Sequence, residues 1–185
     1  GRWRQFYQVG AEVLGSDLPA VDAEVIEMAL WYLNSLGVEA RLLLNSVGCR
    51  NCRPRYIGLL QTELAKCAGD LCEDCRRRAT PNSLRVFDCK IESCQPHIDR
   101  LPAITDHLCA ECSEHFGIVK SLLDEGGIGY TVTPRLVRGL DYYVRTAFEI
   151  VSGELGSQNA LAGGGRYDGL SQALGGPPVH ALGFA

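Results

Sequence analysis

Cysteines gather in the middle of this 185-residue chain, and their spacing constrains the fold of that region more than any other feature. Cys67 stands apart, and the other eight form four close pairs, Cys49/Cys52, Cys72/Cys75, Cys89/Cys94 and Cys109/Cys112. A C-x-x-C loop can present two thiolates to one zinc ion, and tetrahedral closure needs two such pairs. The pairs can therefore build two structural Zn2+ sites, or one site with spare thiols, and the sequence does not say which pairs converge.

The cysteine pattern also bears on the cellular compartment. An odd count, the C-x-x-C spacing and the lack of a recognisable secretion signal favour reduced thiols in a cytoplasmic protein. The alternative metal ligands are His97, His107 and His115, although each is more commonly an ordinary surface or helix histidine. The sequence contains no run of 18 apolar residues, so no membrane span is predicted.

Hydrophobic periodicity predicts strands on both sides of a helical middle. The predicted helices are 18–37, 54–67, 70–79 and 104–125. The predicted strands are 2–15, 38–45, 128–134, 141–151 and 158–163. This order favours an α+β fold, with a mostly antiparallel sheet flanked by helices and interrupted by a mainly helical insertion.

We therefore divide the chain into core residues 1–48, a Cys-rich helical insertion 49–127 and core residues 128–185. Residues 50–100 hold ten Lys or Arg and seven Asp or Glu, although the net charge of the chain is −4. A basic insertion is compatible with a polyanion contact, but the run Arg76-Arg77-Arg78 more commonly marks a solvated helix face.

The chain starts with Gly, its only Met is Met28, and it stops in the apolar run HALGFA, so we expect a fragment of a longer protein.

Polar residues share one face of the predicted first strand. On one parity lie Arg2, Arg4, Gln8 and Glu12, and on the other Trp3, Tyr7, Val9, Ala11 and Val13. A charged strand face is usually solvated surface. It can also line a polar pocket, and the rest of the chain has to decide between the two.

Two further stretches combine polar side chains with glycine. Residues 136–150 read LVRGLDYYVRTAFEI, for which the simplest interpretation is a strand end with an Arg–Asp ion pair. Residues 162–170 read AGGGRYDGL, whose glycines indicate a turn or a close backbone approach. The spacing fits neither a P-loop nor a dinucleotide-binding fingerprint.

Together these stretches resemble the histidyl-tRNA synthetases. RGLDYY and GGRYDG are similar to the two signature motifs of that family, and WRQFYQVGAEVLG resembles the second half of its motif 2. NSLRVFDCK is similar to a stretch of its insertion domain, so the resemblance covers the whole chain, up to the Gly183-Phe184-Ala185 lead-in of motif 3. It implies a class II synthetase core that works as a homodimer.

The resemblance implies a two-step reaction on L-histidine, ATP with Mg2+, and tRNA(His). The histidine carboxylate attacks the α-phosphate of ATP and expels pyrophosphate, and the tRNA 3′-terminal hydroxyl then takes the histidyl group. Arg138 matches the catalytic arginine, whose permanent charge would stabilise the negative charge that builds up at phosphorus. We expect the isolated chain to be inactive, because motif 1, the first half of motif 2, motif 3 and the anticodon-binding domain lie outside it.

The same resemblance implies a histidine pocket, whose floor would be the polar face of the first strand. Glu12 matches the residue that accepts a hydrogen bond from the histidine ring, with Tyr143 beside it. Tyr167 matches another pocket residue, and Gln8 a contact to the amino and carboxylate end of histidine. Arg2 matches a motif 2 loop residue near ATP and the tRNA end.

Two other functions fit part of the sequence. A histidine-binding regulatory paralogue, of the ATP phosphoribosyltransferase regulatory subunit type, shares the core but does not charge tRNA. The arginine of RGLDYY and the intact insertion distinguish this chain from it. A stand-alone zinc-stabilised RNA-binding module would use the basic insertion but leaves the pocket unexplained. Val144 departs from the synthetase pattern, which commonly has Asn there.

Overall fold

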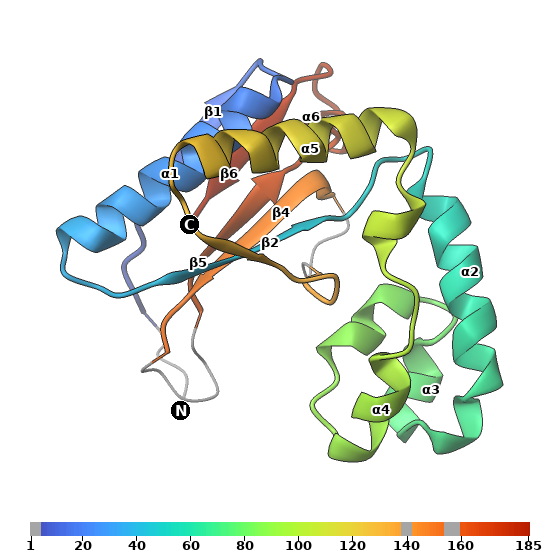
Figure 1. Ribbon diagram of the computed structural model, residues 1–185. Coiled ribbons are helices and arrows are strands. Elements are labelled where there is room, and N and C mark those ends of the chain that lie inside the picture. The colour runs from blue at the N-terminus through green and yellow to red at the C-terminus, as the bar shows by residue number, and fades with distance from the viewer. Residues whose placement is uncertain (1–4, 138–141, 154–159) are drawn as a thin grey trace.

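The computed structural model describes residues 5–137, 142–153 and 160–185, whose strands form one six-stranded sheet in the order β1-β6-β5-β4-β2-β3 (Figure 1). The strands are β1 (Ala11–Leu14), β2 (Arg41–Ser46), β3 (Tyr130–Val132), β4 (Val144–Val151), β5 (Ala160–Arg166) and β6 (Ala181–Phe184). Neighbouring strands are antiparallel except for β2 and β3, which are parallel. The predicted α+β fold with a mostly antiparallel sheet is confirmed.

Two long helices, α1 (Pro19–Ser35) and α5 (Ala110–Glu125), pack against each other and cover one face of the sheet (Figure 1). A proline in the first turn of α1 fits a helix start, because that turn has no intrahelical acceptor for its N–H groups. Their apolar stripes meet the sheet in a single core, formed by Val25, Ile26, Ala29, Leu42, Leu44, Phe116, Val119, Leu123, Phe148, Ile150, Leu182 and Phe184, with others.

The Cys-rich middle forms a lobe beside the sheet (Figure 1). Its α-helices are α2 (Arg53–Lys66), α3 (Glu73–Arg78) and α4 (Gln95–Ile98). Its 3-10 helices are η1 (Ala68–Asp70), η2 (Ser83–Asp88), η3 (Glu92–Cys94) and η4 (Ile104–His107). A second apolar cluster, centred on Tyr56, Leu60, Val86 and Ile98, fills this lobe. A short helix, α6 (Leu170–Ala173), follows β5 in the core. None of the described helices is long and apolar enough to cross a membrane.

Two elements differ from the sequence-based expectations. From Gln5 onward, where the described part of the chain begins, the first strand covers only Ala11–Leu14, because β6 offers partners to these residues alone. The predicted helix 104–125 is broken into η4 and α5. The division of the chain at residues 48 and 127 stays a prediction, and within it α5 packs on the core sheet rather than in the lobe.

Candidate functional site

The polar face of β1 opens onto a cavity on the sheet face opposite α1 and α5. Ala11 and Val13 pack against the core, so Glu12 between them points to the other face. The cavity measures about 330 Å³ and is lined by Gln8, Glu12, Tyr142, Tyr143, Gly163, Tyr167, Leu170, Gly183, Phe184 and Ala185. The structure thus brings all four described residues that were predicted to bind histidine to one cavity, while their roles stay predictions.

Glycines form the floor of this cavity. Glu12 pairs across the strands with Gly183, and a Cβ added to Gly183 would lie 1.7 Å from the Glu12 Oε2 atom. The glycine is therefore required for the carboxylate to lie over the sheet. In β5, Gly163 lines the cavity, while a Cβ on Gly164 would lie 2.7 Å from the ring of Phe148 in the core. The triple glycine thus serves close backbone approach within a strand, which is one of the two alternatives that the sequence left open.

Three tyrosine rings gather at one side of the cavity. Tyr142 and Tyr143 have ring centroids 5.0 Å apart, and Tyr167 lies edge-on to both at 6.0 and 6.3 Å. The Tyr167 hydroxyl donates a hydrogen bond to Glu12 Oε2. Burial and this bond to a carboxylate raise the pKa of Tyr167 above its usual value, so the phenol keeps its proton even in alkaline solution and remains a hydrogen-bond donor.

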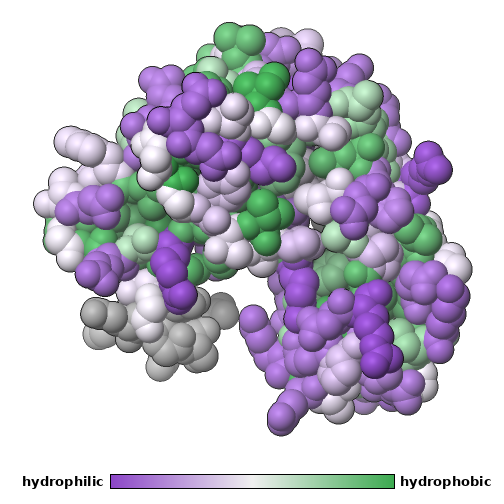
Figure 2. All heavy atoms as spheres, in the orientation of Figure 1, coloured by the Kyte–Doolittle hydropathy of each residue, from purple (hydrophilic) through white to green (hydrophobic). Residues whose placement is uncertain are grey.

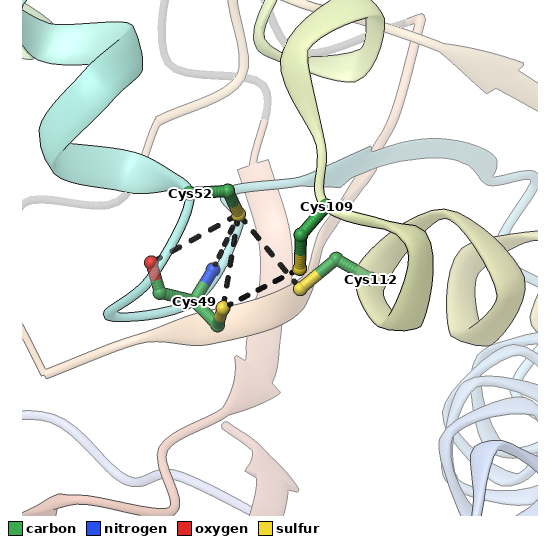
Figure 3. Close-up of side chains that lie close together, drawn as sticks. All are labelled: Cys49, Cys52, Cys109 and Cys112. Carbon is green, nitrogen blue, oxygen red and sulfur yellow. Dashed lines mark hydrogen bonds between the residues drawn. The ribbon is translucent and has the colours of Figure 1, made fainter.

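The cysteines converge in two groups, each of which could hold a metal ion. The first, which we name the junction group, consists of Cys49, Cys52, Cys109 and Cys112 (Figure 3). Its sulfur atoms are 3.8 Å apart for Cys49–Cys52 and Cys49–Cys109, and 3.9 Å apart for Cys52–Cys112. The first pair precedes α2 and the second lies at the start of α5 (Figure 3). The group therefore lies where the chain enters the lobe and where it leaves the lobe again.

The second group, which we name the inner group, lies inside the lobe and consists of Cys72, Cys75, Cys89 and Cys94. The Cys72 and Cys89 sulfur atoms are 3.9 Å apart. The backbone N–H of Cys75 contributes to lowering the pKa of the Cys72 thiol to about 7. Cys67 belongs to neither group and donates to backbone carbonyls of its own helix. The candidate metal groups of the described residues contain no histidine.

We compared the chain with protein-family models, with curated proteins and with solved structures. Residues 62–185 match the family model described as "Histidyl-tRNA synthetase". The histidine–tRNA ligases of Solibacter usitatus and Maridesulfovibrio salexigens are 56% and 53% identical to the chain over its full length. The apo histidyl-tRNA synthetase of S. aureus has a similar structure, with a TM-score of 0.73 at 36% identity, covering 95% of this chain and 43% of that one.

The chain belongs to the histidyl-tRNA synthetase family. It spans 44% and 46% of the length of the two curated relatives. The family resemblance of the sequence is thereby confirmed, and so is the fold class.

Two residues matched to this synthetase family, Arg138 and Arg2, fall outside the described residues. Val144, where we expect Asn from the family resemblance, lines a neighbouring cavity of about 300 Å³ rather than the one with Glu12. That second cavity extends from Cys49 of the junction group to Asp168 and His180.

Sequence reasoning missed a buried ion pair behind the synthetase motif GGRYDG. Arg166 and Asp22 are both fully buried, and the Arg166 guanidinium donates to both carboxylate oxygens of Asp22. His115 Nε2 and the Thr146 hydroxyl also bind this carboxylate. Asp168 accepts from Arg166 and from the backbone N–H of Ala181 in β6. A signal was available in the sequence, because Asp22 lies one turn before Val25 and Ile26 on the apolar stripe of the predicted helix.

Proposed function

We propose that the chain forms the histidine-recognising part of a histidine–tRNA ligase, an ATP-dependent aminoacyl-tRNA synthetase. The observation that carries this proposal is the cavity around Glu12, Gln8, Tyr143 and Tyr167 in a chain of this family. A carboxylate over a glycine floor suits a flat ring that donates N–H groups, as the imidazole of histidine does.

In this proposal Tyr167 and Glu12 act together in recognition. An ionised carboxylate has about four lone-pair sites, so the bond from the Tyr167 hydroxyl leaves others for an imidazole N–H. The protonated phenol also fixes the orientation of the carboxylate before histidine arrives. An amino acid without a matching donor would leave Glu12 desolvated and unpaired, which is the costly outcome on which such pockets base selectivity. Gln8 at the rim would contact the amino and carboxylate end.

The proposed chemistry takes place at the carboxylate of the bound histidine. It attacks the α-phosphorus of ATP, pyrophosphate leaves with Mg2+, and the tRNA 3′-terminal hydroxyl then displaces AMP from the histidyl-adenylate. Arg138 is the proposed catalytic residue, since a guanidinium can bind carboxylate and phosphate oxygens at once and offset the charge of the transition state. Arg2 is proposed to lie near ATP and the tRNA end.

The proposed macromolecular partners are tRNA(His) and a second copy of the protein, in the cytoplasm. Figure 2 shows hydrophilic residues over much of the surface of the insertion lobe. Two of the three consecutive arginines on α3, Arg76 and Arg77, are exposed, which supports contact with a polyanion such as tRNA. The homodimer is proposed from the family resemblance alone.

We also propose that the two cysteine groups hold structural Zn2+. A regular tetrahedron of sulfur atoms at the usual Zn–S distance of 2.3 Å has edges of about 3.8 Å. The sulfur distances of 3.8 to 3.9 Å fit these edges. A disulfide bond would require a much shorter distance between the two sulfur atoms, about 2.05 Å.

Histidine-dependent exchange between ATP and pyrophosphate in the complete protein tests the enzyme proposal. We expect exchange with histidine and with no other amino acid, and its loss in Arg138→Ala while histidine binding persists. Histidine binding without any exchange would instead support the regulatory paralogue, in which the same pocket is a sensor. If the complete protein showed no exchange and also failed to bind histidine, that result would contradict both the enzyme proposal and the regulatory paralogue.

A further inference from the structure

The two cysteine groups occupy different places in the molecule, and we infer that they have different functions. We propose that a zinc ion in the junction group fixes the backbone that presents Tyr143 to the histidine pocket, whereas the inner group only stabilises the lobe. This inference rests on the zinc sites and the histidine pocket proposed above, and it assigns a positioning function to one of the metals.

The junction group has the local geometry of a metal-binding knuckle. The backbone N–H of Cys49 donates to Cys52 Sγ over 3.2 Å, and that of Asn51 donates to Cys49 Sγ over 3.4 Å. Such bonds stabilise thiolates and orient them toward an ion. Gly48 begins the knuckle with φ +67°, and a Cβ there would lie 2.9 Å from Cys52 Sγ. The loop therefore depends on glycine to bring the two sulfur atoms together.

Arg53 connects this knuckle to the histidine pocket. It directly follows Cys52, and its Nε donates to the carbonyl of Val47 over 2.9 Å. Its terminal nitrogen Nη2 donates to the carbonyl of Gly48 over 3.4 Å and to the carbonyl of Tyr143. One guanidinium thus links the loop that holds the metal to the residue whose ring lines the cavity.

The backbone next to Tyr143 is bound to the same loop. The N–H of Arg145 donates to Gly48 O over 2.8 Å, and the N–H of Val47 donates to Arg145 O over 2.7 Å. Arg145 has φ +53°, in the left-handed region that costs a non-glycine residue free energy and persists only where surrounding contacts hold it. The junction loop supplies those contacts, so a loosened loop would release the start of β4 and Tyr143 with it.

The inner group provides a natural contrast. The hydrogen bonds of its cysteines run to one another and to five further residues of the lobe, Arg76, Ala79, Val86, Ile91 and Gln95. Of these partners, Gln95 also accepts from Arg135, but through its own side chain and not through a cysteine. In the described residues, none of the bonds made by the cysteines reaches the sheet or the cavity. A variant of this group should therefore lose its metal and weaken the lobe without moving Tyr143.

The test compares five forms of the complete protein: wild type, Cys49→Ser, Cys72→Ser, Arg53→Met and the control Arg55→Met. Arg55 is exposed and lies in the same turn of α2 as Arg53. We expect two zinc ions per wild-type chain, one in each cysteine variant and two in each arginine variant, by elemental analysis that also reads iron. Histidine binding, measured by calorimetry, should weaken about tenfold in Cys49→Ser and Arg53→Met and stay within about twofold of wild type in the other two.

Hydrogen exchange gives a readout that does not depend on histidine. The amides of Val47 and Arg145 should exchange about tenfold faster in Cys49→Ser than in Cys72→Ser or wild type. Equal exchange in both cysteine variants, or wild-type histidine affinity in Arg53→Met with both metals retained, would overturn the inference. If wild type failed to bind histidine while the exchange contrast held, the positioning function would stand and the proposed histidine pocket would fall.

Discussion

At the scale of single residues, the cavity depends on glycines, which leave space, as much as on the polar side chains that line it. Gly183 leaves room for the Glu12 carboxylate, and Gly163 lines the same cavity without adding a side chain. The resemblance to a known family pointed to Glu12, Tyr143 and Tyr167. It did not point to Gly183 as their support, because a glycine in a sequence shows only that the backbone is free of a side chain and not which neighbour uses the space.

Replacing Glu12 with Gln should weaken histidine binding by about 10- to 100-fold, since a charge-assisted hydrogen bond is replaced by a neutral one. Glu39→Gln, at an exposed position, serves as the matched control and should leave affinity unchanged. Calorimetric titration with histidine measures both. Equal affinities in the two variants would remove Glu12 from the recognition site.

Replacing Gly183 with Ala should lower histidine affinity at least tenfold, because the new methyl group would occupy the place of the Glu12 carboxylate. The control is Gly117→Ala in the exposed face of α5, where nothing lies within 4 Å of the added Cβ. That control should keep affinity and gain about 1 kcal/mol of stability from helix propensity. Wild-type affinity in Gly183→Ala would show that Glu12 does not need its observed position.

At the scale of elements, the buried carboxylate of Asp22 ties α1 to the sheet and to α5. Its partners come from β5, β4 and α5, in the form of Arg166, Thr146 and His115. Burial opposes the ionisation of Asp22, but the hydrogen bonds from these groups and the charge of Arg166 outweigh it, so the Asp22 pKa lies below its ordinary value. Arg166 of GGRYDG is therefore an anchor that fixes the neighbouring Tyr167.

Replacing Asp22 with Asn should cost about 3 kcal/mol of unfolding free energy at pH 7, because it leaves a buried guanidinium without its main counter-charge. The folded-state pKa of Asp22 is lowered, so its stabilisation is complete above the ordinary value of 3.8 and is lost as pH falls through the folded pKa. The difference between wild type and variant should therefore shrink on acidification. Urea unfolding at several pH values measures it, with exposed Asp17→Asn as control. A difference that is independent of pH would contradict this account.

Helices with a clear hydrophobic periodicity were predictable from the sequence. Strands whose ends are set by pairing with another strand were less predictable. The apolar stripe of 18–37 gave α1 to within two residues at each end. The first strand was predicted too long, since its length depends on the extent of β6, which no local pattern contains. The meeting of Cys49 with Cys109 was equally out of reach, because 60 residues separate them and only the tertiary fold brings them together.

At the scale of the whole molecule, the chain contains a pocket but covers less than half of its curated relatives. We expect the 185-residue chain by itself to show no histidine-dependent ATP–pyrophosphate exchange and no tRNA charging, whereas the complete protein shows both. Parallel assays at equal concentration test this. Exchange by the 185-residue chain above the level of its Arg138→Ala variant would refute it.

The junction group has a consequence for how such a lobe can be gained, lost or replaced. The chain leaves the sheet at Cys49 and returns at Cys109, and their sulfur atoms are only 3.8 Å apart. A segment whose two ends meet at one point can be shortened, exchanged or excised without stretching the framework that carries it. We therefore expect that a short turn between residues 48 and 110 can replace the lobe and still connect β2 with α5, at the cost of the contacts that Arg135 makes with Gln95 and Asp99 in the lobe.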